Sequence, residues 1–163
     1  MTANENDLQF PTGVAALVLC GACKRLGFCH LGLAAESLDA DGALIARLTC
    51  PRDHEGGPGV AHGGWTAAAF DEVLGHVSLL HGQMAVTATL TVDFLKPVPI
   101  ERELQARGWI ERREGSRIYI RGELRLSGSG ALLGSAHGVW VARDYGHFER
   151  HRQWLAQQDS PTP

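Results

Sequence analysis

A histidine, two glycines and a more distant aspartate form the stretch of the sequence that is best suited to chemistry: His62, Gly63, Gly64 and Asp71. An ionised carboxylate in an apolar segment needs a partner or a chemical role, because burying it unpaired is costly or raises its pKa. Glycines that open a helix leave backbone N–H groups unpaired, and such groups can stabilise an oxygen that gains negative charge. The glycines can also serve only to fit a turn against a neighbouring sheet, so the sequence leaves both interpretations open.

The segment that follows these glycines is predicted to be a helix. Residues 65–80 are apolar on almost every side, which is typical of a helix at the buried centre of a domain. On one regular helix, His62 and Asp71 would lie about 13 Å apart and face roughly opposite directions. They cannot share a site within one chain, but a two-fold dimer with antiparallel helices can set Asp71 of one subunit against the His62-Gly63 turn of the other. Glu72 lies about 100° round the helix from Asp71, so we expect the two carboxylates not to point into one pocket.

The rest of the chain is predicted to form a sheet around this helix. Residues 31–38 and 43–50 read as two strands joined by an Asp-Gly turn at 39–42. After the helix, residues 85–95 alternate strictly, with Val86 and Leu90 on one face and Thr87 and Thr91 on the other. Three further strands are predicted at 103–113, 117–127 and 131–143, separated by short turns. This order indicates an α+β fold, with an antiparallel sheet wrapped around one long central helix.

The ends of the chain are predicted to lie outside this unit. We expect a lead-in at residues 1–18, one domain at 19–144 and a polar, partly helical tail at 145–163. Residues 10–26 read as a short helix. The 163 residues suffice for a single core without disulfides.

The composition of the chain argues against several classes of partner. The formal net charge of −3 and the pI near 6.2 give no basic surface for nucleic acid. No apolar run is long enough to span a membrane, and the first ten residues do not resemble a signal peptide, so we expect no membrane partner and a cytoplasmic location. Cys20, Cys23, Cys29 and His30 could supply four zinc ligands, but the gap before the second pair is shorter than usual. We therefore expect reduced thiols, no metal and no cofactor.

The central motif resembles a known family. HGGWTAAAFDE, preceded by GPGVA and followed by TATLTVDFLKP, resembles the hot-dog-fold acyl-CoA thioesterases, in particular the PaaI-like and THEM branch of the 4-hydroxybenzoyl-CoA thioesterase superfamily. The likeness covers about residues 19–142. It implies a hot-dog fold and hydrolysis of an acyl-CoA thioester to free acid and CoA. It also implies a homo-oligomer, either a dimer or a dimer of dimers.

The resemblance assigns roles to four residues. Asp71 matches the catalytic carboxylate, as general base or as nucleophile, and the Gly63 N–H matches the oxyanion donor. His62 would orient or polarise the thioester oxygen, and Thr87 would position the attacking water. Some relatives carry an asparagine six residues before the histidine, where this chain has Gly56.

Two alternatives and a set of weaker candidates accompany this assignment. The missing asparagine leaves open a non-catalytic module that binds acyl-CoA or an aromatic acid. A hot-dog dehydratase or hydratase fits less well, because its histidine and acid are spaced differently.

The weaker candidates share a position near the helix or a strand end, where they can meet the acyl group or the CoA phosphates: Gly64, Glu72, His76, Lys96, Arg112 and Arg117.

Overall fold

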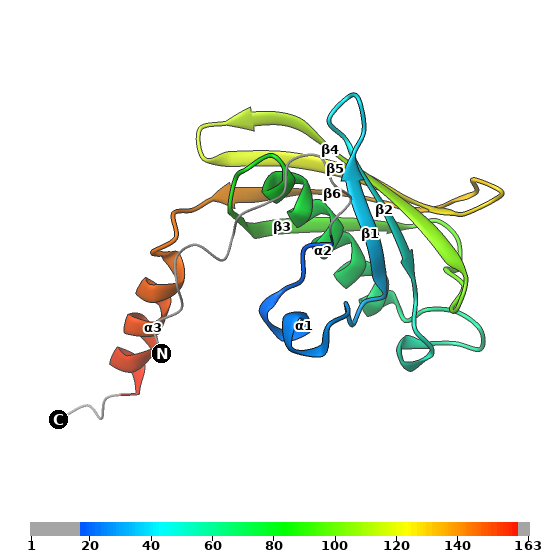
Figure 1. Ribbon diagram of the computed structural model, residues 1–163, viewed down its shortest axis with the longest axis horizontal. Helices are drawn as coiled ribbons and strands as arrows, with labels where there is room; N and C mark the ends of the chain where they lie inside the picture. The colour runs from blue at the N-terminus through cyan, green and yellow to red at the C-terminus, as the bar shows by residue number, and fades with distance from the viewer. Residues whose placement is uncertain (1–16, 160–163) are drawn as a thin grey trace.

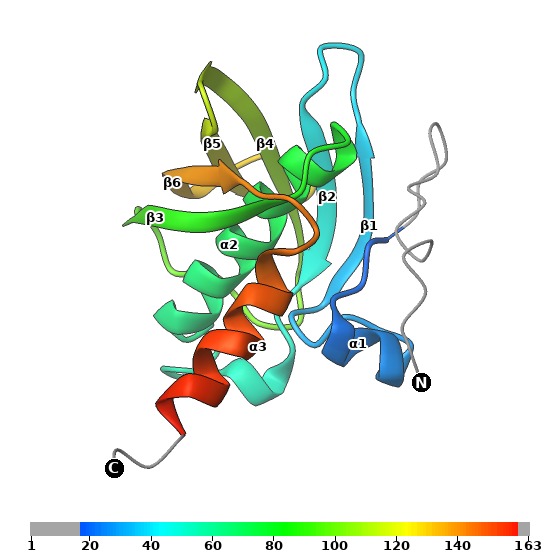
Figure 2. The same ribbon diagram turned by 90° about the vertical axis from the view of Figure 1, so that its left-hand side faces the viewer.

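The protein is described by a computed structural model for residues 17–159. Six strands form one antiparallel sheet in the order β1-β2-β4-β5-β6-β3. The elements in chain order are α1 (Gly21–Leu26), β1 (Leu33–Leu38), β2 (Leu44–Thr49), the 3-10 helix η1 (Arg52–His54), α2 (Gly63–Leu80), β3 (Ala85–Phe94), β4 (Glu103–Glu114), β5 (Arg117–Leu126), β6 (Leu132–Ala142) and α3 (His147–Gln158). The sheet curves around α2, which confirms the predicted α+β class (Figures 1 and 2).

Most predicted elements lie within one or two residues of the observed bounds. The Asp-Gly turn forms as expected, with the Gly42 N–H donating to the Asp39 carbonyl at 3.0 Å and Gly42 at a φ of 77°. The predicted helix at 10–26 is wrong in part, because residues 17–20 are not helical and α1 begins only at Gly21. Its first seven residues lie outside the described part of the chain.

Helix α2 approaches the sheet closely because two glycines face it. Gly108 of β4 pairs with Gly122 of β5, and both lie beneath Leu74 of α2. A Cβ atom at Gly122 would come within 2.5 Å of the Leu74 side chain, and one at Gly108 within 2.9 Å. The helix buries Trp65, Phe70 and Leu74 against this sheet. The two glycines therefore set how deeply the central helix sits.

Strand β3 carries a bulge that reverses its alternation. Thr87 pairs with Trp140 and Thr89 with Val139, so Ala88 is the extra residue between them. A bulge shifts the two sides of a strand by one position. Ala85 and Leu90 consequently both pack against the core, although regular alternation would place an odd-numbered and an even-numbered residue on opposite faces. Thr87 lies on this same helix-facing side, whereas strict alternation predicted it on the opposite face from Leu90.

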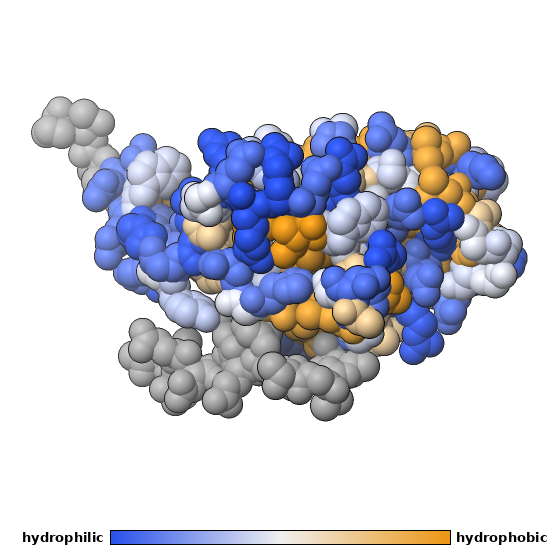
Figure 3. All heavy atoms as spheres, turned by 90° about the horizontal axis from the view of Figure 1, so that it is seen from above, coloured by the Kyte–Doolittle hydropathy of each residue, from blue (hydrophilic) through white to orange (hydrophobic). Residues whose placement is uncertain are grey.

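The other face of the sheet is mostly hydrophilic. Figure 3 shows this face, with charged residues between small apolar patches. The charges pair along the strands, as in Arg121 with Glu111 at 2.6 Å and Arg125 with Glu123 at 2.7 Å. Strand β3 ends the sheet, and Phe94 and Leu95 near its end are more than half exposed. Among the described helices, none is long and apolar enough to cross a membrane.

Candidate active site

Asp71 lies in the middle of α2 and accepts a hydrogen bond from Thr87. The Thr87 hydroxyl donates to the Asp71 Oδ1 at 2.7 Å, across the gap between α2 and β3. The bulge at Ala88 makes this contact possible, because it turns Thr87 toward the helix. Asp71 is partly exposed in the single chain, although the apolar run around it predicts a buried helix. Asp71 sits on a partly covered side of α2, next to the edge strand β3.

A cavity of about 490 Å³ opens beside Asp71. This volume is typical of sites that bind small molecules. Its walls come from α1, α2, β3, β6 and α3, and they include Lys24, Asp71, Glu72, His76, Leu79, Val86, Thr87, Trp140 and Phe148. Asp71 and Glu72 both line it, so the expectation that they could not share a pocket is wrong. The physical reason is that a cavity of this width spans the angle between neighbouring helix positions.

A charged cluster closes one side of this cavity. His76 contacts the Glu36 Oε2 through Nδ1 at 2.8 Å and the Glu72 Oε1 through Nε2 at 3.2 Å. Burial alone lowers the pKa of His76, but the hydrogen bonds to Glu36 and Glu72 outweigh it and raise the pKa to about 9. The imidazole is therefore cationic at neutral pH. The sequence predicts a satisfied or exposed histidine at position 76, which can line the acyl pocket. In the structure His76 is hydrogen-bonded and buried, and it forms part of the cavity wall.

Glu36 is the residue of this cluster that the sequence did not indicate. It lies on β1 and is only 2% exposed. Its Oε1 accepts a hydrogen bond from the Val18 N–H at 2.9 Å. A bulge between Leu33 and Ala35 turns Glu36 to the same inner side as Leu33. An acid in an otherwise apolar predicted strand is the signal that could have drawn attention to it.

The glycine turn forms a second, separate region. His62 is the N-cap of α2, and its Nδ1 accepts a hydrogen bond from the Gly64 N–H at 2.9 Å. Since Nδ1 is the acceptor, the ring proton is on Nε2, which is left able to donate. The Gly63 N–H, in the first turn of the helix, has no hydrogen-bond partner among the described residues. Gly64 thus serves the cap, and Gly63 offers the unpaired donor.

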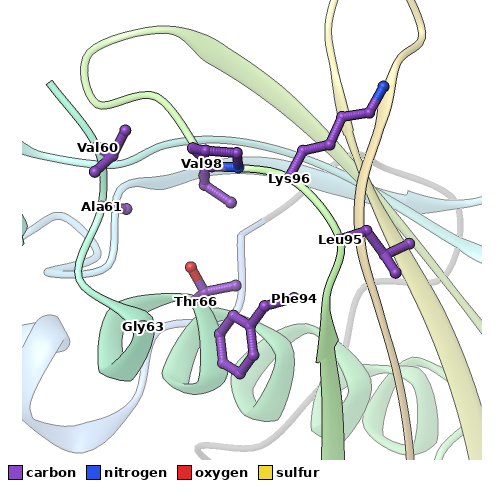
Figure 4. A pocket seen from close by; sticks show the side chains of 9 residues that line it. Val60, Ala61, Gly63, Thr66, Phe94, Leu95, Lys96 and Val98 are labelled. Carbon is purple, nitrogen blue, oxygen red and sulfur yellow. The ribbon is translucent and has the colours of Figure 1, made fainter. Parts of the chain in front are cut away.

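A smaller cavity of about 230 Å³ lies at this turn. Gly63, Thr66 and Phe94 line it together with the segment from Leu95 to Val98 (Figure 4). No residue lines both this cavity and the one beside Asp71. The single chain therefore holds two separate regions, one with the Asp71 carboxylate and one with the unpaired Gly63 N–H.

Gly56, where some relatives carry an asparagine, packs tightly against the same turn. A Cβ atom there would lie 2.8 Å from the His62 Cα. A side chain at this position would require the backbone at His62 to move. The packing of the turn explains the glycine without any reference to chemistry.

The basic candidates are not brought together in one chain. Lys96 lines the cavity at Gly63, but its side chain points away from Gly63 and Thr66 (Figure 4). Arg112 lies at the opposite end of the sheet, where it pairs with Glu114 at 2.8 Å and covers the Tyr119 ring at 3.5 Å. Arg117 begins β5 beside this hairpin and is exposed. The CoA-binding role of these residues stays a prediction.

The cysteines near α1 do not gather into a metal site. Cys20 is exposed, whereas Cys23 and Cys29 are buried, and the Cys23 sulfur accepts a hydrogen bond from the His30 N–H. Within residues 17–159, no group of three or more His, Cys, Asp or Glu side chains is placed to hold a metal ion. Both buried cysteines belong to the hydrophobic core.

Comparisons with known proteins match this chain to thioesterases. A family model described as the thioesterase superfamily matches residues 58–132. Acyl-coenzyme A thioesterase THEM4 of Bos taurus is 28% identical over 90 residues, which are 55% of this chain and 37% of the relative. The chain thus spans less than half the length of the curated relatives that it matches.

Solved structures agree with this match. A thioesterase superfamily protein, RHA08564, has a TM-score of 0.63 and 27% identity, over 68% of this chain and 56% of that one. A Streptococcus pneumoniae thioesterase with coenzyme A has a TM-score of 0.61 and 18% identity, over 66% of this chain and 84% of that one. The family model, the relatives and the solved structures together show that this chain is similar to proteins of the thioesterase superfamily.

Proposed function

We propose that the protein is an acyl-CoA thioesterase that hydrolyses a CoA thioester to the free acid and CoA. The observation that carries this proposal is the hydrogen bond from Thr87 to Asp71 in the wall of a ligand-sized cavity. The relative named as an acyl-CoA thioesterase and the solved thioesterase with coenzyme A support this substrate class.

Asp71 acts in this proposal as a general base. Thr87 uses its only O–H to donate to Asp71 Oδ1, so its oxygen can only accept from a further group. A water that donates one hydrogen to Thr87 and the other to the free Asp71 Oδ2 is held for attack on the thioester carbonyl. The carboxylate takes the proton as the C–O bond forms. The C–S bond then breaks, and the departing CoA thiolate takes up that proton from Asp71, which gives the free acid and the CoA thiol.

The oxyanion donor in this proposal comes from a second subunit. Asp71 and the Gly63 N–H lie in separate regions of one chain, and a two-fold axis between antiparallel α2 helices would join them. The Gly63 N–H would then stabilise the negative charge on the thioester oxygen, with the His62 Nε2–H as a second donor. The exposed Phe94 and Leu95 lie beside Gly63 and give a second subunit apolar surface to cover.

Matched variants test the two roles. Asp71→Asn removes the charge at equal volume and should lower kcat about 10²- to 10⁴-fold. Gly63→Pro deletes the N–H at a helix position where proline is well tolerated, and should lower kcat about 10²- to 10³-fold. Gly63→Ala is its control, because it keeps the N–H and its Cβ would lie 3.6 Å from Phe94 at ordinary contact distance.

Mixing the two inactive variants tests the shared site. Asp71→Asn and Gly63→Pro, unfolded together and refolded in equal amounts, form half mixed dimers, and each of these has one intact site. We therefore expect about a quarter of wild-type activity. A mixture as inactive as its parents contradicts a site built by two subunits.

Two further measurements separate the alternatives. In a single turnover in water enriched in heavy oxygen, a general base places the label in the released acid, whereas a nucleophilic Asp71 transfers one of its own oxygens. If acyl-CoA binds stoichiometrically and no CoA thiol is released by wild-type protein, the chain is a binding module and the proposed activity is wrong.

A further inference from the structure

We propose that the cavity beside Asp71 selects acyl groups by the polarity of their far end, through the Glu72 carboxylate. Glu72 would accept a hydrogen bond from a hydroxyl or ammonium group on the acyl chain and would repel a carboxylate. This inference rests on the proposed thioesterase function, because it places the acyl group in the cavity that contains Asp71.

The arrangement of the cluster leaves one oxygen of Glu72 available. Both His76 nitrogens are used, one by Glu36 and the other by the Glu72 Oε1. Both Glu36 oxygens are used as well, by the Val18 N–H and by His76. The Glu72 Oε2 has no hydrogen-bond partner among the described residues, and the side chain is 26% exposed. It is the acceptor of the cluster that a ligand can reach.

Glu36 and His76 act as positioning residues for Glu72. The Glu36 side chain is completely buried and the His76 side chain is 6% exposed, so neither can turn away without leaving a buried charge unpaired. The pair joins β1 to α2 and holds the Glu72 carboxylate at a fixed place on the wall. An acceptor that is held in this way discriminates strongly between ligands, because an unmatched ligand leaves it unsatisfied.

The charges around the cavity favour a neutral or cationic acyl end. Asp71, Glu72 and the Glu36 behind them carry three negative charges, against the positive charges of Lys24 and His76. A carboxylate in this cavity would therefore meet net repulsion. A plain hydrocarbon end would contact Leu79, Trp140 and Phe148 favourably, but it would also remove water from the Glu72 oxygen without replacing it. An acyl chain with a terminal hydroxyl group can contact the apolar wall and also donate a hydrogen bond to the Glu72 oxygen.

Substrates of equal length that differ only at the far end test this inference. We would compare kcat/KM for hexanoyl-CoA, ω-hydroxyhexanoyl-CoA and adipoyl-CoA, which end in a methyl group, a hydroxyl group and a carboxylate. For the wild-type protein we expect the hydroxylated substrate to exceed the methyl-ended one by about tenfold or more, the factor that one hydrogen bond to a charged acceptor supplies. We expect the carboxylate-ended substrate to be the poorest by a similar factor.

Glu72→Gln is the variant that removes the charge at nearly equal volume. It should reduce both ratios, because a neutral amide oxygen accepts a weaker hydrogen bond than a carboxylate and does not repel a negatively charged substrate end. Glu123→Gln is its control, because Glu123 is also ion-paired and has a similar side-chain exposure of 32%, but lies in another part of the fold. The control should keep the wild-type ratios. A ratio is insensitive to a general loss of folded protein, so a purely structural role of Glu72 would not change it.

The outcomes separate this inference from the function on which it rests. If no substrate releases CoA, the thioesterase proposal fails. If all three are hydrolysed by wild-type protein at similar kcat/KM, the thioesterase proposal stands and the role of Glu72 is wrong. Equal ratios in Glu72→Gln and wild-type protein also overturn the role of Glu72. The wild-type comparison decides the question even if the variant does not fold.

Discussion

Raising the pH should weaken the fold through His76. This imidazole has a pKa of about 9 instead of its usual 6.5, because hydrogen bonds to Glu36 and Glu72 outweigh the effect of burial. A group whose pKa is raised by folding stabilises the protein fully below its unfolded pKa, and that contribution is lost as the pH rises through the folded value. The loss should therefore occur between about pH 6.5 and about pH 9. Other groups that face the same region are Asp71, Lys24 and Cys20.

The size of this contribution follows from the change in pKa. At about 1.4 kcal/mol for each pH unit, a rise from 6.5 to about 9 corresponds to about 3 kcal/mol of unfolding free energy. The His76 side chain is only 6% exposed, so solvent screens little of this contribution. Such a value is a large fraction of the stability of a domain of this size.

Two measurements check this prediction. The ring proton resonances of His76, followed by NMR from low to high pH, report its titration directly. Urea unfolding of wild-type protein and of Glu36→Gln at several pH values reports the energy, and the difference between them should shrink as the pH rises toward about 9. Glu123→Gln, which alters a partly exposed ion pair on the sheet surface, should differ from wild type by less than about 1 kcal/mol at every pH.

Two results would contradict a cationic His76 that is held by its ion pairs. If His76 titrates at or below about pH 6.5 in the folded protein, the buried ion pairs do not hold the proton. A difference between wild type and Glu36→Gln that is constant with pH would show that Glu36 acts by packing alone.

Two further predictions concern Gly122, which lies beneath α2, and the Thr87 hydroxyl. Gly122→Ala should lower the free energy of unfolding by about 1–3 kcal/mol, because the new Cβ atom would lie 2.5 Å from the Leu74 side chain. Urea denaturation measures this loss. Gly21→Ala is the control and should leave stability near wild type, because its Cβ atom would meet nothing within 4 Å. Thr87→Val removes the hydroxyl at equal shape and should lower kcat at least about tenfold. Thr87→Ser keeps the hydroxyl and should retain most activity. Equal rates for the two variants would exclude the hydroxyl from the reaction.

The elements that were predicted well are those with a long and regular pattern. The apolar run at 65–80 and the alternation at 85–95 gave α2 and β3 almost to the residue. The turns at 114–116 and 128–130 likewise separate strands that pair with each other. These features are local, and short-range physics decides them. The position of β3 beside β6 instead of β4 is a long-range choice that no local pattern contained.

The environment of Asp71 was predicted only in part, because apolarity alone does not place a helix face. Ala67 and Ala68 made α2 look buried all round, yet both are only partly buried and share the partly covered side with Asp71. Small apolar residues are compatible with a core and with a surface that another molecule covers. The sequence thus indicated an unusual carboxylate, and the structure changes its explanation from burial in the core to a place in a cavity wall.

The residues that sequence reasoning placed wrongly or missed depend on two bulges. Strict alternation puts Thr87 on the face away from the helix, and the extra residue Ala88 reverses this. The irregularity between Leu33 and Ala35 does the same for Glu36. Each bulge occurs in a strand at one edge of the sheet, where an inserted residue disturbs only one neighbouring ladder. One edge thus brings the hydroxyl to Asp71, and the other brings the acid to His76. These two polar contacts of the cavity therefore depend on interruptions of the regular pattern, which is why periodicity predicted the scaffold better than the site.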